Sequence, residues 1–421
     1  MKKILIISRG AWSDNNAIGN TLSNLFSDVK TFEMHNVYMR SELPGKTPCH
    51  SIYQINEFGL IRSLKTLSNT GGVLDSQQSL SEVTIEEKLY TAYQNKNLYS
   101  LWIVRDILWI LGKWRHNLRQ YINEIKPDLI FMPVFGCVYA HRVLNVIKKE
   151  SNAKVVLFHA DDHYSLNQKN FSPLFWLYRF WLRRWIRRSV RFSHVNFCIS
   201  DIQILDYNKY FGVNCKLLQK FHDFSGPRPD YSIEPPIKIV FTGSMECGRW
   251  KSLAKIADAV DSLNSDTEQR CTFAIYSGTK LTSSQVLLFQ NKKGVILKGF
   301  VSSVYIKEIQ TSADILVHVE SFDADDKLRV RQSFSTKIVD YLSRGRCILA
   351  VGPTDIASIQ YFEKYKSAYV ITNPSEVYKK LSELISDYSL METYADKAWS
   401  CGYANNGYHK REEFLELLSS L

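Results

Sequence analysis

The stretch KIVFTGSMECGRWKSL, from Lys238 to Leu253, decides the fold. Its apolar, β-branched start is short and ends at Gly243, and a helical pattern begins a few residues later. A short, continuously apolar run is typical of a parallel strand buried on both faces, and a glycine turn into a helix is typical of a β-α-β unit. Similar pairs of strand and helix recur on both sides of this stretch. The sequence therefore predicts an α/β protein built on parallel sheets.

Ten segments carry the predicted strands of these sheets. In the first half they are Lys3–Ser8, Asp128–Pro133, Lys154–His159 and His194–Ile199. In the second half they are Lys238–Thr242, Thr272–Ser277, Val295–Lys298, Ile315–Val319, Cys347–Val351 and Ala368–Ile371. The segment 35–82 is polar and poorly periodic, and we expect irregular loops there.

The chain has 421 residues, which is long for a single hydrophobic core, so two domains are expected. The best boundary is FSGPRPDYSIEPP, which carries four prolines and a glycine before a clean strand. We predict a first domain over 1–224, a linker over 225–236 and a second domain over 237–405. A last helix over 406–421 is expected to pack back on the first domain. Ligands should bind where loops follow the strands, in a cleft between two facing sheets.

Bulk composition narrows the function classes. The formal net charge of +11 favours anionic partners such as phosphorylated substrates, anionic lipid or nucleic acid. No apolar stretch is long enough to span a bilayer, and the apolar run after the basic N-terminus is too short for a signal peptide. The eight cysteines form no CxxC motif and are expected to be reduced thiols. We therefore expect a cytoplasmic protein.

Four segments of the second half occur together in order: VFTGSMECGRWKSL, FAIYSG, LKGFVSSVYIKEIQTSADILVHVES and FSTKIVDYLSRGRCILAVGP. This combination resembles the donor-binding domain of GT-B glycosyltransferases, and is similar to the group-four family that builds bacterial surface polysaccharides. In the first half, NNAIGNTLSNLF is similar to the family's first glycine-bearing loop and helix, and LFHADDHYS to its central loop. The resemblance implies two Rossmann-like domains facing a cleft. It also implies transfer of a sugar from a nucleotide-sugar donor to a glycan or lipid-linked acceptor, without a metal or other cofactor.

The sequence departs from the family at three places. Ser244 stands where the family often has an arginine. The family often carries two glutamates with seven residues between them; Asp340 occupies the second position and Gln332 the first. Glu320 is the nearest acid, so the role of the first glutamate is open.

The predicted donor site gathers cations near two helix starts. A departing nucleoside diphosphate gains negative charge, which fixed cations and helix N-termini stabilise. We expect Lys337 to stand beside free amides and Asp340, one turn later on the same helical face, to accept hydrogen bonds from the ribose. A solvated Lys–Asp pair on an ordinary helix and a purely structural glycine turn are the alternatives. The predicted donor-binding residues are Gly19, Gly243, Ser244, Arg249, Lys251, Ser335, Thr336, Lys337 and Asp340.

The segment from His159 to His163 holds four titratable side chains directly after a predicted strand. Histidine can act as a base near neutral pH, and aspartate can orient a hydroxyl or stabilise positive charge on the sugar. We predict His159, Asp161 and Asp162 as catalytic. A polar capping loop and a metal site remain the alternatives.

The segment 171–195 contains six arginines, three tryptophans and no acidic residue. This composition is typical of an amphipathic helix on an anionic membrane surface, and the arginines exclude a membrane span. An ordinary core helix with a basic outer face is the alternative. The predicted membrane-docking residues are Trp176, Trp181, Arg183, Arg184, Trp185, Arg187 and Arg188. Docking would make the protein peripheral on the inner leaflet of the cell membrane.

Other functions remain open at this stage. Arginine with interleaved aromatic residues would also suit nucleic acid, but no nucleic-acid-binding motif is present and we expect no such partner. A nucleotide-sugar epimerase of GT-B fold is the second alternative. A dehydrogenase is disfavoured because no GxGxxG follows the first strand.

Overall fold

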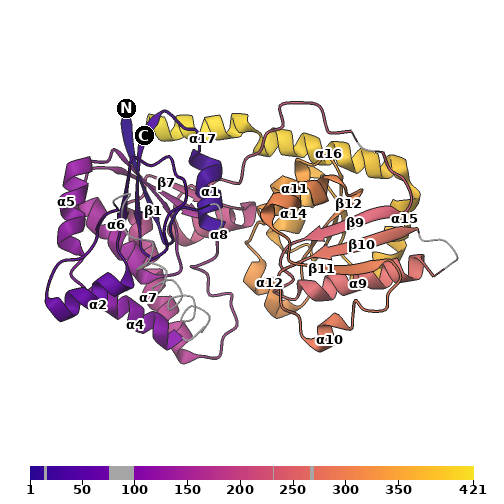
Figure 1. Ribbon diagram of the computed structural model, residues 1–421, viewed down its shortest axis with the longest axis horizontal. Helices are drawn as coiled ribbons and strands as arrows, with labels where there is room; N and C mark the ends of the chain where they lie inside the picture. The colour runs from indigo at the N-terminus through magenta and orange to yellow at the C-terminus, as the bar shows by residue number, and fades with distance from the viewer. Residues whose placement is uncertain (14–16, 75–98, 231, 266–269) are drawn as a thin grey trace. The chain divides into compact units, whose positions relative to one another are not determined.

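The computed structural model describes residues 1–13, 17–74, 99–230, 232–265 and 270–421. Asn15 and Asn16 of the quoted glycine-bearing motif and Tyr231 of the predicted linker lie outside these ranges. The described chain forms two compact units (Figure 1). The first comprises residues 1–166, 170–218 and 413–421, and the second 167–169 and 219–412. The main segment of the second unit thus begins at Gln219, before the predicted linker at 225–236.

The first unit is built on a sheet of eight strands in the order β4-β3-β2-β1-β5-β6-β7-β8. All neighbours pair in parallel except β3 and β4. The chain order reverses direction between β1 and β5. The strands are β1 Lys2–Ser8, β2 Phe32–Tyr38, β3 Ser51–Gln54, β4 Gly72–Val73, β5 Leu129–Pro133, β6 Lys154–His159, β7 Val195–Cys198 and β8 Lys216–Leu217.

Helices cover both faces of this sheet. Ile130 and Met132 of β5 join the core beneath α5, α6 and α7, whereas Phe131 between them packs on the opposite face against Phe26 and Phe414. This alternation follows from the two-residue period of a strand. The helices are α1 Ala17–Phe26, α2 Glu57–Thr66, α4 Tyr99–Leu111, α5 Arg115–Ile125, α6 Val138–Glu150, α7 Pro173–Arg191 and α8 Asp201–Phe211.

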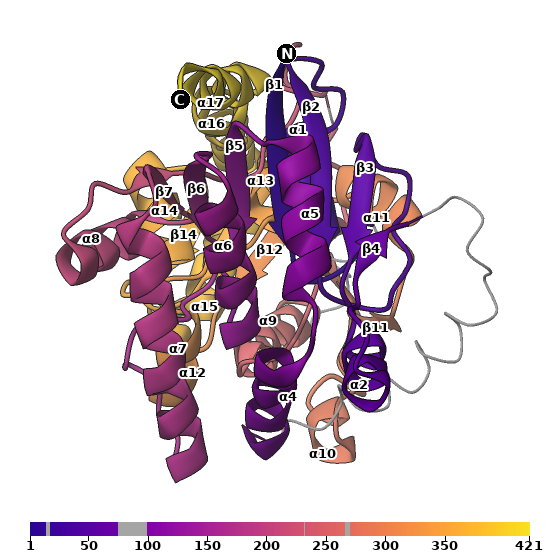
Figure 2. The same ribbon diagram turned by 90° about the vertical axis from the view of Figure 1, so that its left-hand side faces the viewer.

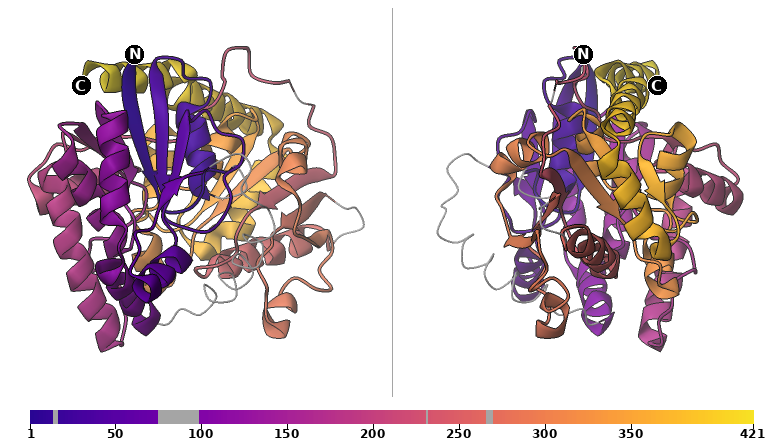
Figure 3. Two further views of the ribbon diagram at one scale, coloured as in Figure 1. Left: turned by 60° about the vertical axis from the view of Figure 1, so that its left-hand side comes forward. Right: turned by 90° about the vertical axis from the view of Figure 1, so that its right-hand side faces the viewer.

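The last helix, α17 Tyr408–Ser420, packs its C-terminal part on the first unit. Phe414 contacts Phe26, Phe131 and Phe197, with ring centroids 5.5–6.2 Å apart. The Nζ atom of Lys2 donates to the carbonyl of Ser419, so the two chain ends lie together (Figure 3).

The second unit is built on six parallel strands in the order β11-β10-β9-β12-β13-β14. They are β9 Ile237–Thr242, β10 Cys271–Tyr276, β11 Val295–Gly299, β12 Ile315–Val319, β13 Cys347–Val351 and β14 Tyr369–Ile371. The direction of strand order changes between β9 and β12. The helical segments are α9 Arg249–Leu263, α10 Ser283–Val286, α11 Ser303–Thr311, α12 Ala324–Val330, α13 Lys337–Leu342, α14 Ala357–Tyr365, the 3-10 turn Pro374–Glu376, α15 Val377–Ser386 and α16 Tyr388–Asn406.

The prediction of two doubly wound α/β sheets is confirmed. The expectation of irregular loops over 35–82 was wrong for its described part, because β2 extends through Tyr38 and β3 and α2 both lie within it. Among the described residues, no helix combines the length and apolar character needed to cross a bilayer. All eight cysteines are free thiols.

Candidate functional site

Four elements of the second unit bring most of the predicted donor-binding residues to one edge of its sheet. Gly243 directly follows β9, and Glu320 directly follows β12. Arg249 and Lys337 are the first residues of α9 and α13. Since β9 and β12 are the neighbours between which the strand order changes direction, this edge is where an open parallel sheet binds its ligands.

Gly243 and Lys337 are in intimate contact. Gly243 has φ of +143°, and a Cβ atom built there would collide with the Nζ atom of Lys337. That Nζ atom donates to the carbonyl of Thr242 at 2.9 Å, while the Thr242 amide donates to the hydroxyl of Tyr341 at 3.2 Å. The strand end thus holds the ammonium directly over the glycine, where only glycine fits.

The surroundings of Lys337 lower the pKa of its ammonium group. Burial, and then the neighbouring charge of Arg249, lowers its pKa to about 8, against the opposing effects of Glu320 and Asp340. An ammonium has three donors, and the Thr242 carbonyl takes one of them. Lys337 can therefore donate to an anion at this edge, and its charge is sensitive to pH just above neutrality.

Arg249 is held by a bidentate ion pair with Glu320. Its Nε and Nη2 atoms each donate to a different carboxylate oxygen at 3.0 Å. A paired, parallel geometry of this kind fixes the plane of the guanidinium. Three of the five guanidinium N–H donors are not used by Glu320. Arg249 thus presents an oriented cation beside Lys337.

Glu320 is itself buried and anchored from behind. Its side chain is 3% exposed, and its Oε1 atom lies 3.4 Å from Nε2 of His318, which also contacts the Ser358 hydroxyl at 3.1 Å. Burial would raise the pKa of Glu320, but the contacts with His318 and Arg249 outweigh it and lower the pKa. Glu320 is therefore an ionised carboxylate whose two oxygens face Arg249.

The other predicted donor-binding residues of the second unit have contacts of their own. Lys251 forms an exposed ion pair with Asp323, and Asp340 accepts from Lys220 Nζ at 2.6 Å. The Ser244 hydroxyl lies 3.4 Å from that of Thr279. Ser335 and Thr336 immediately precede α13, partly buried and exposed respectively. A ribose would compete with Lys220 for the carboxylate of Asp340.

Several amides at the starts of α9 and α13 are already bonded within the protein. The amides of Arg249, Trp250 and Lys251 all donate to carbonyls of the preceding turn, and the Ile338 amide donates to the Ser335 carbonyl. At the start of α13, the Ile338 amide is thus already bonded within the protein. Side-chain cations carry the positive character of this edge.

Gly19 belongs to the first unit. It is buried in α1, and a Cβ atom there would collide with the backbone of Ser13. This contact packs α1 against the loop that follows β1. Its predicted role in donor binding stays a prediction.

The predicted catalytic loop of the first unit is largely occupied by its own contacts. His159 is 1% exposed, faces the Asn196 side chain and packs edge-on against Tyr207. Asp162 accepts from the amides of Tyr164 and Ser165 at 3.0 and 2.7 Å. Asp161 is the exposed member of the three.

His163, which is not among the predicted catalytic residues, lies against the loop after β5. Its ring is so close to Gly136 that a Cβ atom at Gly136 would approach Nδ1 within 2.9 Å. Burial lowers the pKa of His163.

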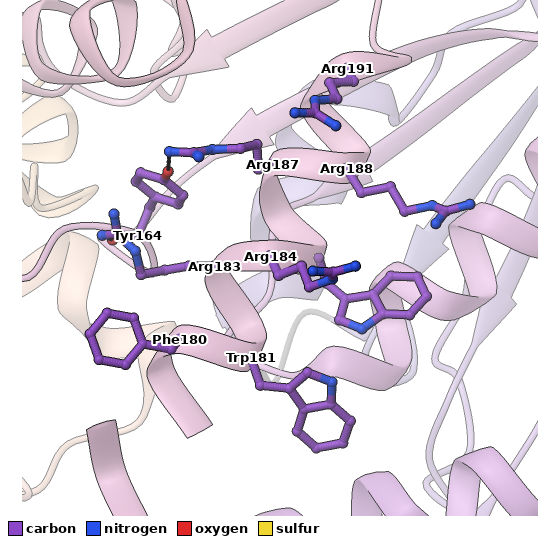
Figure 4. Close-up of a pocket in the computed structure, with 9 residues that line it drawn as sticks. Tyr164, Phe180, Trp181, Arg183, Arg184, Arg187, Arg188 and Arg191 are labelled. Carbon is purple, nitrogen blue, oxygen red and sulfur yellow. Dashed lines mark hydrogen bonds between the residues drawn. The ribbon is translucent and has the colours of Figure 1, made fainter. Parts of the chain in front are cut away.

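The arginine-rich helix α7 lines a pocket of about 880 Å³ in the first unit (Figure 4). Arg183 and Arg187 both donate to Tyr164, to its carbonyl and its hydroxyl respectively. Arg188 stacks on Trp185. Trp181 and Trp185 pack against the core beneath the helix, and Nε1 of Trp176 donates to the Asn170 carbonyl. The tryptophans are thus partly buried, and the exposed arginines of α7 lie in its second half, from Arg184 to Arg191.

Three features of these sites had no signal in the sequence. They are the pairing of Arg249 with Glu320, the support of Glu320 by His318, and the pairing of Asp340 with Lys220. Each joins residues on different elements. Within the described part of the chain, no group of three or more His, Cys, Asp or Glu side chains could hold a metal ion. Catalysis without a metal stays a prediction.

Comparisons with known proteins add the fold family. No protein-family model and no curated protein sequence matches the chain. Solved structures do match. HepE from Anabaena, in complex with UDP and glucose, aligns over 100% of both chains with a TM-score of 0.61 and 13% identity. Sucrose-phosphate synthase from Thermosynechococcus elongatus aligns over 100% of both chains with a TM-score of 0.60 and 10% identity.

TarM from S. aureus, in complex with fondaparinux, α-GlcNAc-glycerol and UDP, aligns over 73% of this chain with a TM-score of 0.52 and 16% identity. The chain spans 59% of the length of that TarM chain. Similarity at these identities establishes the fold. The chain has the fold of GT-B glycosyltransferases, with two Rossmann-like domains, as predicted.

Proposed function

We propose that this protein is a glycosyltransferase that moves a sugar from a nucleotide-sugar donor to a glycan or lipid-linked acceptor. One observation carries the proposal. In a GT-B fold, Gly243, Lys337 and Arg249 place a glycine and two cations at the edge of a sheet where the strand order changes direction. The structures of HepE were determined with UDP and with UDP-glucose, so UDP is the first nucleotide to test.

The chemistry follows from the charge at this edge. When the sugar departs, the nucleoside diphosphate gains negative charge, and cations fixed in advance stabilise that charge without reorganisation. Lys337 would donate its remaining N–H groups to the diphosphate, and Arg249, oriented by Glu320, would donate beside it. Asp340 would release Lys220 and accept from the ribose hydroxyls. No step of this scheme requires a metal.

The acceptor side is proposed for the first unit. The exposed Asp161, rather than the buried His159, is the member of the predicted catalytic loop that can reach a ligand without rearrangement. We propose that the acceptor belongs to bacterial surface polysaccharide and is presented at the inner leaflet, to which the exposed arginines of α7 attract the protein. The supports are the charge of +11 and the absence of an acidic residue over 171–195.

A thermal-shift panel of UDP, GDP, ADP and CMP tests the donor assignment. A ligand that binds only the native state raises the melting temperature by mass action. We expect a shift with one nucleoside diphosphate, and with UDP first, that is lost in Lys337→Ala. Sugar-donor turnover without any acceptor would instead favour an epimerase. Salt-sensitive DNA binding without any nucleotide shift would favour a nucleic-acid-binding protein.

A further inference from the structure

The helices α2, α4 and α7 of the first unit expose apolar side chains on neighbouring surfaces. The helix α4 packs against both α2 and α7, and Figure 2 shows all three at the same end of the unit. On α4, Val104, Ile107 and Leu111 are 59%, 44% and 59% exposed. Their spacing of three and four residues places them on one face of the helix.

The two neighbouring helices repeat the pattern. Ile61, Leu64 and the C-cap residue Leu67 are exposed on α2, and Leu174, Leu177 and Phe180 are exposed on α7. Each set is spaced by three residues. Exposed apolar stripes on three adjoining helices are unusual for a surface that faces only water.

The exposed charges on these helices all have one sign. Of their two acidic residues, Asp106 is buried and accepts from Tyr178 and from the Tyr139 amide, and Glu57 is largely buried beside Arg105. The exposed charged residues of the three helices are all basic: Arg62, Lys65, Arg184, Arg187, Arg188 and Arg191.

We propose that α2, α4 and α7 together dock the first unit on an anionic lipid bilayer, with the aliphatic side chains of α2 and α4 entering the headgroup layer. The charge pattern selects this occupant. A second copy of the chain would bring another basic surface against this one, whereas a bilayer with anionic lipids complements both the apolar stripes and the cations. The proposal deepens the proposed function, on which it rests for a lipid-linked acceptor.

This surface differs from the one that the sequence predicts. The tryptophans of α7 are partly packed inward. The apolar contacts shift to Val104, Ile107 and Leu111, while the arginines of α7 supply the electrostatic part.

Flotation of the full-length protein with vesicles tests the proposal. We expect binding to vesicles of phosphatidylcholine with phosphatidylglycerol, and none to phosphatidylcholine alone. The triple variant Val104→Ser, Ile107→Ser, Leu111→Ser should lower partitioning roughly tenfold or more, because apolar burial is lost. The double variant Arg184→Ser, Arg191→Ser should weaken binding and reduce its dependence on salt.

The matched control is the triple variant Leu205→Ser, Leu287→Ser, Val304→Ser, which removes apolar side chains elsewhere that are more exposed than those of α4. It should bind vesicles like the parent protein. Thermal melting checks that both triple variants are folded. Parental vesicle binding by the α4 variant would overturn the proposal. A dimer in light scattering that this variant dissolves would assign the surface to a second copy instead.

UDP affinity separates this proposal from the proposed function. The α4 variant should bind UDP like the parent protein, because it leaves the second unit unchanged. Vesicle binding without any nucleotide binding would refute the glycosyltransferase and leave the docking surface in place.

Discussion

The two units differ in how the polar side chains near the carboxyl ends of their strands are bonded. In the second unit, Lys337 uses one of its three N–H donors on the Thr242 carbonyl, and Arg249 uses two of its five on Glu320. The other donors of these two cations are available to a ligand. In the first unit, polar groups of the loop after β6 form hydrogen bonds within the loop. Asp162, for example, accepts from the amides of Tyr164 and Ser165. We therefore expect a ligand to bind where cationic donors remain available in the fold, rather than where titratable residues are merely close together in the sequence.

The largest loss of UDP affinity should follow from adding a side chain at Gly243. In Gly243→Ala the new Cβ atom meets the ammonium of Lys337, at a φ of +143° that a side chain rarely adopts. We expect UDP affinity, measured by calorimetry, to fall roughly 100-fold or more, because the backbone and Lys337 must both move.

Gly212→Ala is the matched control for backbone strain alone. Gly212 also has a positive φ, of +67°, but a Cβ atom there meets nothing within 4 Å. This variant should lose about 1 kcal/mol of stability and bind UDP normally. Equal UDP affinity in the two variants would contradict the contact between Gly243 and Lys337 as the cause.

Removal of the Lys337 charge should come next. Lys337→Met keeps most of the side-chain volume but loses the ammonium, and should cost about 2–4 kcal/mol in transition-state stabilisation. The readout is the sugar-transfer rate at saturating donor. An unchanged rate and an unchanged UDP affinity would mean that the donor binds elsewhere.

The pKa of Lys337 sharpens this prediction. With a pKa of about 8, the side chain is charged below that pH and loses its proton above it. A bound diphosphate raises the pKa, so UDP affinity should be level below about pH 8 and fall as the pH rises further. Lys337→Arg, which stays charged, should show a level profile over the same range. A parental profile that does not fall above pH 8 would exclude Lys337 as a phosphate contact.

Glu320 tests whether the carboxylate holds Arg249 or acts on the sugar. In Glu320→Gln the ion pair is lost, so Arg249 should move and UDP affinity should fall about tenfold, with a loss of about 1–3 kcal/mol in stability. A carboxylate that acts on the sugar would behave differently, with turnover abolished and UDP affinity unchanged. Titration of UDP and single-turnover transfer separate the two outcomes.

The predictability of the fold depended on what lies within each strand. The strands from β9 to β14 are short and mostly apolar and could be predicted. In contrast, β2 contains the buried polar residues His35 and Asn36. Their burial is tolerated because His35 forms a hydrogen bond with the Ser51 hydroxyl and Asn36 donates to the carbonyl of Ile6. Such partners come from other strands, so the segment looked like a loop.

The same limit applies to the site. The sequence motif placed Gly243 and Lys337 in one site because both belong to recognisable strand ends and helix starts. It could not place Glu320 on Arg249, since 71 residues separate them and no periodicity relates them.

The smallest effect, and the finest test of the comparison, comes from the adjacent acids of the first unit. Asp162→Asn should destabilise the protein by about 1–3 kcal/mol, because the carboxylate accepts two amides and faces Arg179 at 3.6 Å. Asp161→Asn should leave stability within about 0.5 kcal/mol of the parent, since the residue is exposed. If the loop reaches the acceptor, Asp161→Asn should lower turnover while UDP affinity stays unchanged. Thermal melting and transfer kinetics on both variants decide the matter, and full activity in Asp161→Asn would leave the loop as the internally bonded structure that its contacts describe.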